Sequence, residues 1–169
     1  MKHQSHATWT LARTAVIVTF SCAAAHAQVR TEHNMSLELA TLLASEAMAV
    51  CTAKGYDVSV VVTDRGGATR ASLRGDGAGP HTLPSAQQKA FTAVSANATT
   101  QSMGERAQSP GGPAYLAHIP GFLLLGGGVP VKLGSEVIGA VGVAGAPRGL
   151  QDEQCAMAAI DKVRERLAP

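Results

Sequence analysis

The side chains best suited to ligand chemistry lie in two long loops. The first loop, residues 74–82, reads RGDGAGPHT and combines three glycines with His81 just before a predicted helix. Glycines let backbone amides approach a ligand, and the start of a helix offers unpaired N–H groups and a partial positive charge. The same residue types are also ordinary turn formers between a strand and a helix. The loop is therefore a candidate anion-binding site, with a simple turn as the alternative.

The second loop covers residues 101–118 and holds Tyr115 and His118. Imidazole and phenolate groups both bind ferric haem iron, and imidazole binds many other metals. Taken singly, each residue has an ordinary alternative role, such as a hydrogen bond to a loop carbonyl or packing. Because ligands bind preferentially at loops, we interpret His81, Tyr115 and His118 together as candidate ligand contacts, with His81 and Tyr115 as the candidate iron ligands.

Two other motifs resemble known functional sites but lack part of the required sequence. Residues 126–128 form a Gly-Gly-Gly run, but the Lys-Ser/Thr pair of a phosphate-binding loop is missing and Pro130 stands where a helix would have to start. We interpret this run as a hairpin turn. Ser85, His81 and Asp76 could be drawn as a hydrolase triad, but they lack the sequence of a nucleophile elbow.

Residues 1–27 are typical of a secretory signal peptide. Lys2 and Arg13 precede an apolar stretch over residues 14–25, and a small-x-small cleavage site ends at residue 27. The apolar stretch is shorter than the about 20 residues that a membrane-spanning helix needs. We therefore predict a periplasmic or secreted protein, with one domain over residues 28–169 and no membrane span after signal removal.

The predicted mature chain is formally neutral. The whole chain has 14 basic and 12 acidic residues, and the two basic residues of the leader account for the difference. A neutral chain with 4% aromatic residues offers neither the basic surface nor the stacking platforms of a nucleic-acid-binding protein. We therefore predict no nucleic-acid partner.

Cys51 and Cys155 are the two cysteines of the predicted mature chain. In an oxidising compartment they would pair if their Cα atoms lay within about 7 Å of each other. Two buried free thiols are the alternative, and the sequence leaves both open. Their spacing does not match a zinc site.

Apolar residues three and four positions apart predict helices, and β-branched runs bounded by glycine predict strands. The predicted helices cover residues 36–54, 85–100 and 152–167, the last one capped by Asp152. The predicted strands cover residues 58–63, 68–73, 122–125, 129–133 and 137–144. Residues 101–118 are predicted as a loop with a short helical turn at 103–107, because proline and glycine are dense there. Short turns between strands make them antiparallel, so the sequence predicts an α+β domain with a five-stranded antiparallel sheet covered by helices.

Three segments of the chain resemble the GlcG/HbpS family of small haem-binding and ligand-binding domains. They read VVVTDRGGATRASLRGDGAGPHTLPSAQQKAFTA, IPGFLLLGGGVPV and VIGAVGVAGAPRGLQDEQCA, and they occur in the family's order over nearly all of the predicted mature chain. The resemblance implies a profilin-like or Roadblock/longin-like fold, assembly into homo-oligomers and haem as the cofactor. It also implies a role in haem handling or redox sensing.

Carried over residue by residue, the resemblance implies a pocket formed by one loop and the helix after it. The matching positions are Arg74, Asp76, Gly77, His81, Thr82 and Lys89. Arg74 and Lys89 would hold the haem propionates through charge-assisted hydrogen bonds. An apolar wall would come from Leu83, Phe91, Tyr115, Leu116 and Phe122.

We therefore predict a haem-binding protein rather than an enzyme, and two alternatives stay open. The first is an enzyme acting on a small carboxylate or aromatic compound, with Arg74 or Lys89 holding the carboxylate and His81 as general base. The second is a non-catalytic partner subunit with a vestigial site, which assembles into an oligomer through its exposed sheet face.

Overall fold

The computed structural model describes residues 30–167. Within this range, residues 32–167 form one compact unit. The predicted signal peptide, residues 1–27, lies outside the described residues. Among the helices within residues 30–167, none combines the length and the apolar character needed to cross a membrane.

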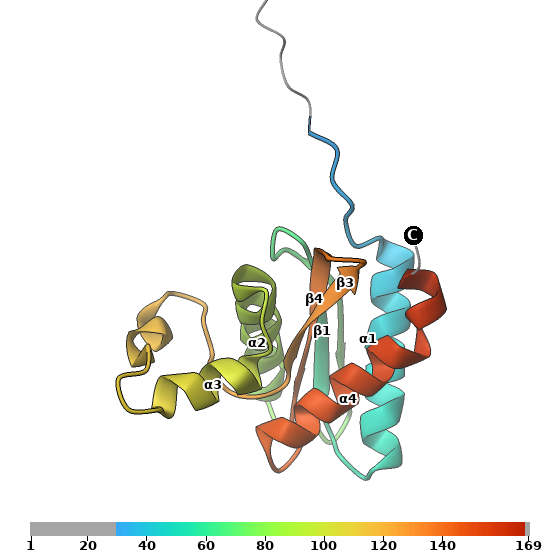
Figure 1. Ribbon diagram of the computed structural model, residues 1–169. Helices are drawn as coiled ribbons and strands as arrows, with labels where there is room; N and C mark the ends of the chain where they lie inside the picture. Colours follow the sequence, from blue (N-terminus) through green and yellow to red (C-terminus); the bar gives the residue numbers. More distant parts are fainter. Residues whose placement is uncertain (1–29, 168–169) are drawn as a thin grey trace, which may run out of the picture. The chain divides into compact units, whose positions relative to one another are not determined.

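A four-stranded antiparallel sheet forms the centre of this unit (Figure 1). Its strands are β1 (Ser59–Asp64), β2 (Thr69–Arg74), β3 (Gly128–Leu133) and β4 (Glu136–Ala144). The strand order is β2-β1-β4-β3, so each edge strand belongs to a hairpin and the two central strands join the hairpins. The central strands are almost entirely buried, which explains why their sequences consist mainly of valine, alanine and glycine.

Two helices cover one face of the sheet, and a third covers the other (Figure 1). The helices α1 (Leu37–Ala53) and α4 (Gly149–Lys162) share one core with the sheet. The helix α2 (Thr82–Ala96) lies on the opposite face. Successive valines of β1 divide between these faces: Val60 and Val62 belong to the α1–α4 core, and Val61 packs against α2.

The helix α2 lies close to β4 because both elements have small side chains where they touch. A Cβ atom on Gly142 would lie 2.0 Å from the Ala86 carbonyl oxygen, so only glycine fits at this point of β4. Ala86 and Ala90 are fully buried in the contact. This packing fixes the height of α2 above the sheet, and with it the positions of the polar side chains on the next face of α2.

The remaining helices are short. They are α3 (Thr100–Gln108) and the 3₁₀ turns η1 (Ala114–His118) and η2 (Arg164–Leu167). The prediction of a loop with a short turn at 103–107 underestimated α3, which has nine residues and begins with a hydrogen bond from the Ser102 N–H to the Thr99 side chain.

The α+β class and the antiparallel sheet are confirmed, but the predicted fifth strand is wrong. Residues 122–125 do not join the sheet: the Leu123 N–H donates to Thr92 Oγ1 on α2 at 2.8 Å. Phe122 packs edge-on against Phe91, with ring centroids 6.1 Å apart. Since α2 side chains hold this segment, the glycine run at 126–128 is the entry to β3 rather than a hairpin turn.

Candidate functional site

A cavity of about 370 Å³ lies between α2, α3 and the first turn of α4. Its volume is within the range of small-molecule sites. His81, Ser85 and Lys89 follow one another at intervals of four residues and form one wall. The α3 side chains at 101, 105 and 108 form the opposite wall. Residues 144–146 and 149 also line the cavity, and Leu124 and Leu125 contribute its largest apolar side chains.

His81 stands directly before α2, at the rim of this cavity. A Cβ atom on Gly79 would lie 2.9 Å from the imidazole ring, so glycine at this position makes room for the ring beside the loop backbone. The His81 carbonyl accepts hydrogen bonds from the Ser85 backbone N–H and from the Ser85 hydroxyl, the latter at 2.8 Å. The first turn of α2 therefore fixes the backbone of His81, and its imidazole makes no capping hydrogen bond to the helix.

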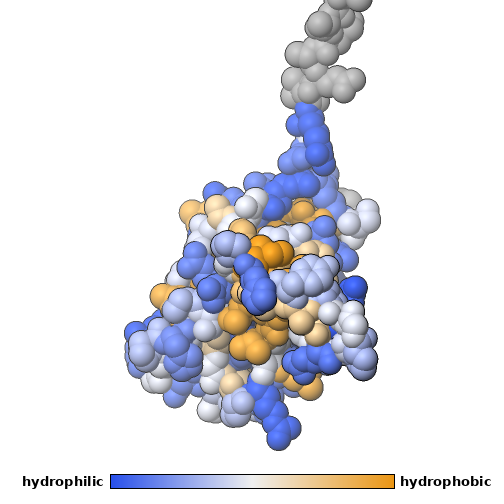
Figure 2. Space-filling model, turned by 90° about the vertical axis from the view of Figure 1, so that its left-hand side faces the viewer, coloured by the Kyte–Doolittle hydropathy of each residue, from blue (hydrophilic) through white to orange (hydrophobic). Residues whose placement is uncertain are grey.

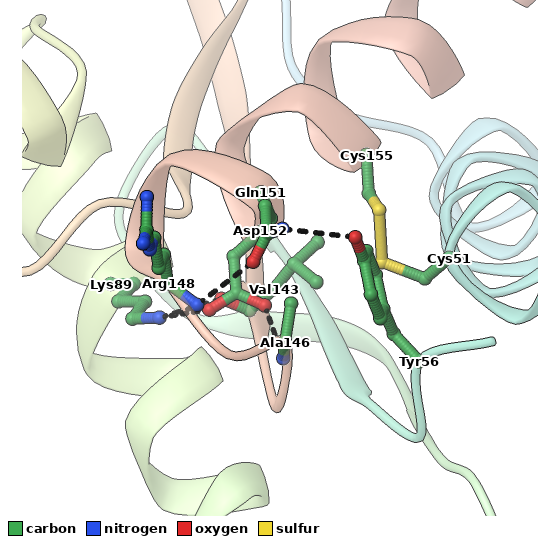
Figure 3. The surroundings of a disulfide bond; sticks show 9 residues. All are labelled: Cys51, Tyr56, Lys89, Val143, Ala146, Arg148, Gln151, Asp152 and Cys155. Carbon is green, nitrogen blue, oxygen red and sulfur yellow. Dashed lines mark hydrogen bonds and ion pairs between the residues drawn. A yellow bond between two sulfur atoms is a disulfide. The ribbon is translucent and has the colours of Figure 1, made fainter. Parts of the chain in front are cut away.

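A buried ion pair joins α2 to α4 at the inner end of the cavity (Figure 3). Lys89 Nζ donates to Asp152 Oδ2 at 2.8 Å and to the Val143 carbonyl at 2.9 Å. The other carboxylate oxygen of Asp152 accepts the Ala146 N–H at 2.9 Å. Lys89 and Asp152 are only 4% and 2% exposed. The pair places a cation and its counter-ion at a fixed point of the cavity wall.

Burial raises the pKa of the Asp152 carboxyl above its ordinary value, and the positive charge of Lys89 opposes this rise. The partners of Lys89 named above account for two of its three N–H groups. The third can serve a ligand, because Lys89 lines the cavity. Because Asp152 already compensates the charge of Lys89, the pair offers a ligand a hydrogen-bond donor rather than a net positive charge.

The α3 wall is polar as well. Gln101 Nε2 donates to Glu105 Oε1 at 2.8 Å, so the two side chains form one hydrogen-bonded surface facing the cavity. The cavity therefore presents amide, hydroxyl, imidazole and ammonium donors together with two carboxylates.

The structure brings together two of the eight predicted site residues, His81 and Lys89. Thr82 is buried beside them: its hydroxyl donates to the Gly79 carbonyl at 2.7 Å and pairs with the Ser59 hydroxyl at 2.7 Å. Thr82 thus holds the loop on β1 and lies behind the cavity wall.

The other loop residues have local partners. The guanidinium of Arg74 donates to the Ala78 carbonyl through Nε at 2.9 Å and Nη2 at 2.5 Å, which closes the loop on itself. Asp76 is exposed, and a Cβ atom on Gly77 would lie 2.4 Å from the Asp57 carboxylate. These contacts stabilise the loop, and their part in ligand binding stays a prediction.

Tyr115 and His118 lie on η1. Tyr115 is 69% exposed and His118 is exposed, and within the described chain the lining of the cavity comes from other residues. Of the predicted apolar wall, Phe91 lines a separate groove with Pro84 and Pro120. The cavity lining within the described chain includes none of the five predicted wall residues. Contact of His81 or Tyr115 with iron stays a prediction.

Sequence reasoning missed Asp152 as a site residue, because it interpreted this carboxylate as the cap of the last helix. The helix begins three residues earlier, at Gly149, so Asp152 lies inside its first turn. A signal was present: Asp152 precedes the buried Cys155 and Ala159 by three and seven residues, which places a charge on the inward face. A carboxylate there needs a buried partner.

The two cysteines whose pairing the sequence left open, Cys51 and Cys155, form a disulfide with Cα atoms 5.6 Å apart (Figure 3). It ties α1 to α4 one turn beyond Asp152. Next to it, Gln151 Nε2 donates to the Tyr56 hydroxyl at 3.0 Å. The first turns of α4 are therefore attached to the core on the side away from the cavity.

This fold and cavity define a small α+β domain with a polar cavity between α2, α3 and α4. The family described as haem degrading protein HbpS-like matches residues 35–161, so the chain belongs to this family, as the resemblance predicted. Protein GlcG of Escherichia coli strain K12 is 33% identical over 115 residues, which cover 68% of this chain and 84% of that protein.

Solved structures agree with this assignment. The crystal structure of a double mutant of HbpS from Streptomyces reticuli superimposes with a TM-score of 0.77 at 41% identity, covering 89% of this chain and 99% of that one. A PduOC:heme complex shares the fold with a TM-score of 0.68 at 22% identity, covering 76% of this chain and 94% of that one. At this lower identity the likeness shows the fold alone.

Proposed function

We propose that this protein binds haem outside the cytoplasm and serves in haem handling or redox sensing. The observation that carries the proposal is the imidazole of His81 at the rim of a cavity, in a chain that belongs to a family described as haem degrading. Imidazole is a common axial ligand of haem iron, and the ring is free of capping bonds to α2.

The residues of the cavity fit one edge of a haem group. Lys89, Gln101 and Gln108 would supply donors for propionate oxygens, and Leu124 and Leu125 would supply apolar contact. A porphyrin is larger than this open cavity of about 370 Å³, so part of it would lie against the outer surface. Apolar side chains gather on the α3 and η1 side of the unit (Figure 2), and Leu125 and Ile119 are 57% and 40% exposed.

The Cys51–Cys155 disulfide supports the extracytoplasmic location. Disulfides form and persist in oxidising compartments such as the periplasm and the cell exterior, and they are rare in the cytosol. The signal-like sequence of residues 1–27 supports the same location.

Titration of the purified protein with hemin, followed by absorbance, tests the proposal. We expect a saturable Soret change that ends at one hemin per chain, and a weaker or shifted band in His81→Ala. Tyr115→Phe tests the second candidate iron ligand in the same assay. His33→Ala is the control, because His33 is exposed and pairs with Glu136 rather than facing the cavity. A non-saturating increase, identical in all variants, would count against the proposal.

A second candidate, binding of or catalysis on a small carboxylate compound, is favoured by the polar character of the cavity. The lining has several hydrogen-bond donors, among them Ser85, Lys89 and Gln108, which suit a short, hydrogen-bonding acid. Thermal unfolding in the presence of short hydroxy acids tests this, because a ligand that binds the folded state raises the melting temperature. A rise with such acids in the absence of any defined hemin endpoint would favour this candidate.

Self-association is a further proposal, supported by the edge strand β2. Most of β2 is exposed, so one edge of the sheet offers unpaired backbone groups to another chain. Size-exclusion chromatography with and without hemin would show whether the protein is an oligomer and whether the ligand changes its size.

A further inference from the structure

Three nearby residues of α4 attach this helix to three different helices. Asp152 holds Lys89 of α2 through an ion pair, and Cys155 holds Cys51 of α1 through the disulfide (Figure 3). Between them, Glu153 accepts the backbone N–H of Gln101, in the first turn of α3. The ion pair and the disulfide fix α4 relative to α1 and α2. The Glu153 contact therefore attaches the start of α3 to a helix that is itself held in place.

Glu153 is a buried carboxylate with a specific role at the start of α3. It is 7% exposed, and its Oε2 lies 3.1 Å from the Gln101 nitrogen. The first N–H groups of a helix have no partner within the helix, and a negative charge near them is favourable. Glu153 therefore both satisfies a backbone donor and stabilises the N-terminal end of α3.

The start of α3 is held at two further points. The Thr99 side chain accepts the Ser102 N–H, and the buried Thr100 hydroxyl accepts the Gly128 N–H at 2.8 Å. Past Gln108 the chain turns through Pro110 and two glycines, and α3 with η1 stands out from the sheet (Figure 1). The hydrogen bonds that join α3 to other elements thus lie at its N-terminal end, and its middle packs through Gly104 against the Leu124 backbone.

Every polar side chain of the second cavity wall comes from α3, at positions 101, 105 and 108. A helix of nine residues is about 13 Å long, so a small tilt at its first turn moves the far end by much more. Glu153 itself is not among the residues that line the cavity within the described chain. Its influence on a ligand must act through the position of α3.

We propose that Glu153 is a positioning residue of the cavity: by anchoring the N-terminus of α3 to α4, it sets the separation of the α3 wall from the α2 wall and thereby the affinity for the ligand. The affinity part of this inference rests on the proposed haem function, whereas the anchoring of α3 does not.

Two substitutions and one control test this role. Glu153→Ala removes the acceptor, and Glu153→Gln keeps an acceptor oxygen in the same place without the charge. Glu165→Ala is the control, because Glu165 is an exposed glutamate on η2. Two quantities are measured: amide hydrogen exchange of residues 100–108, and the hemin dissociation constant.

We expect exchange across residues 100–108 to become about five- to tenfold faster in Glu153→Ala, as for the loss of a helix cap, with the rates in α1 and β4 unchanged. The hemin dissociation constant should rise by a similar factor, and Glu153→Gln should lie between Glu153→Ala and the unsubstituted protein. Glu165→Ala should match the unsubstituted protein in both measurements.

Unchanged exchange in Glu153→Ala would overturn the anchoring role. Faster exchange with unchanged hemin affinity would overturn the link between α3 and the ligand. If the unsubstituted protein itself lacks a defined hemin endpoint, the proposed function fails, and the exchange rates alone then decide whether Glu153 anchors the cavity wall.

Discussion

At the scale of single residues, the Lys89–Asp152 pair is the most consequential feature of the interior. Both side chains are buried, and each has a second partner in the backbone around β4. Removing one member of a buried pair leaves an uncompensated charge, which is far more costly than removing both. The pair therefore couples α2, which begins directly after His81, to α4, which carries Cys155.

We predict that Lys89→Met lowers the free energy of unfolding by about 3 to 5 kcal/mol and that Asp152→Asn also destabilises the protein. The double variant should lose less than the sum of the single losses, because it leaves no unpaired charge. Urea unfolding curves measure these values. Lys162→Met, which breaks the exposed pair with Glu46, is the matched control and should cost under about 1 kcal/mol. Additive losses at 89 and 152 would contradict the coupling.

Glu136 provides a pH-dependent contact at the opposite end of the sheet. Its carboxylate contacts His33 and Arg65, and these hydrogen bonds and charges lower the pKa of Glu136 below its ordinary value of 4.5. A carboxyl with a lowered pKa in the folded state stabilises the fold above its unfolded pKa, and this contribution disappears as the pH falls through the folded value.

We therefore predict that Glu136→Gln melts at a lower temperature than the unsubstituted protein at pH 7 and that the difference shrinks as the pH is lowered through 4.5 and below. Melting curves recorded along a pH series measure this difference. A gap that stays constant down to strongly acid pH would contradict the assignment.

At the scale of elements, the amphipathic helices and β-branched strands could be predicted because their apolar residues repeat with the period of the buried face. The segment 122–125 shows where this reasoning fails. Its sequence FLLL resembles a strand, but its position is decided by Thr92 on α2, which accepts the Leu123 N–H. Likewise α3 has a polar sequence with an internal glycine, and Glu153 and the Gly128 N–H hold its first turn from outside. Local pattern does not encode such tertiary partners.

The candidate site was predictable to a similar degree. The family resemblance placed His81 and Lys89 in one pocket, and the structure brings them together because His81 is the N-cap residue of α2 and Lys89 lies two helical turns further along the same face. Arg74 could not be excluded from it, because the hydrogen bonds of its guanidinium to Ala78 are specific to the folded loop. Glu105 and Gln101 were missed together with the helix that carries them.

The disulfide between α1 and α4 is an element-scale constraint with a measurable effect. It joins residues 104 positions apart, so it restricts the unfolded chain strongly. We predict that Cys51→Ser/Cys155→Ser lowers the free energy of unfolding by about 2 to 5 kcal/mol. Denaturant unfolding with and without a dithiol measures this loss. The dithiol should destabilise the unsubstituted protein and leave the double variant unchanged; equal sensitivity of both would mean that the cysteines are not paired in solution.

At the scale of the whole molecule, the leader-like sequence and the disulfide together make one prediction about export. Cleavage after residue 27 would remove Cys22 and leave Cys51 and Cys155 as the only cysteines, which pair in the folded unit. A correctly exported chain should therefore begin at Gln28 and carry no free thiol even after unfolding. The same chain produced without residues 1–27 in a reducing cytosol should carry two.

Intact-mass measurement after alkylation of the unfolded protein distinguishes these states. We expect the exported protein to lack residues 1–27 and to add no alkyl group, whereas the cytosolic form adds two alkyl groups and unfolds at a lower denaturant concentration. Because α4 carries both Cys155 and the Asp152 and Glu153 contacts, the cytosolic form should also expose α3 to faster amide exchange. An exported chain with residues 1–27 intact, or with two reactive thiols, would contradict the proposed location.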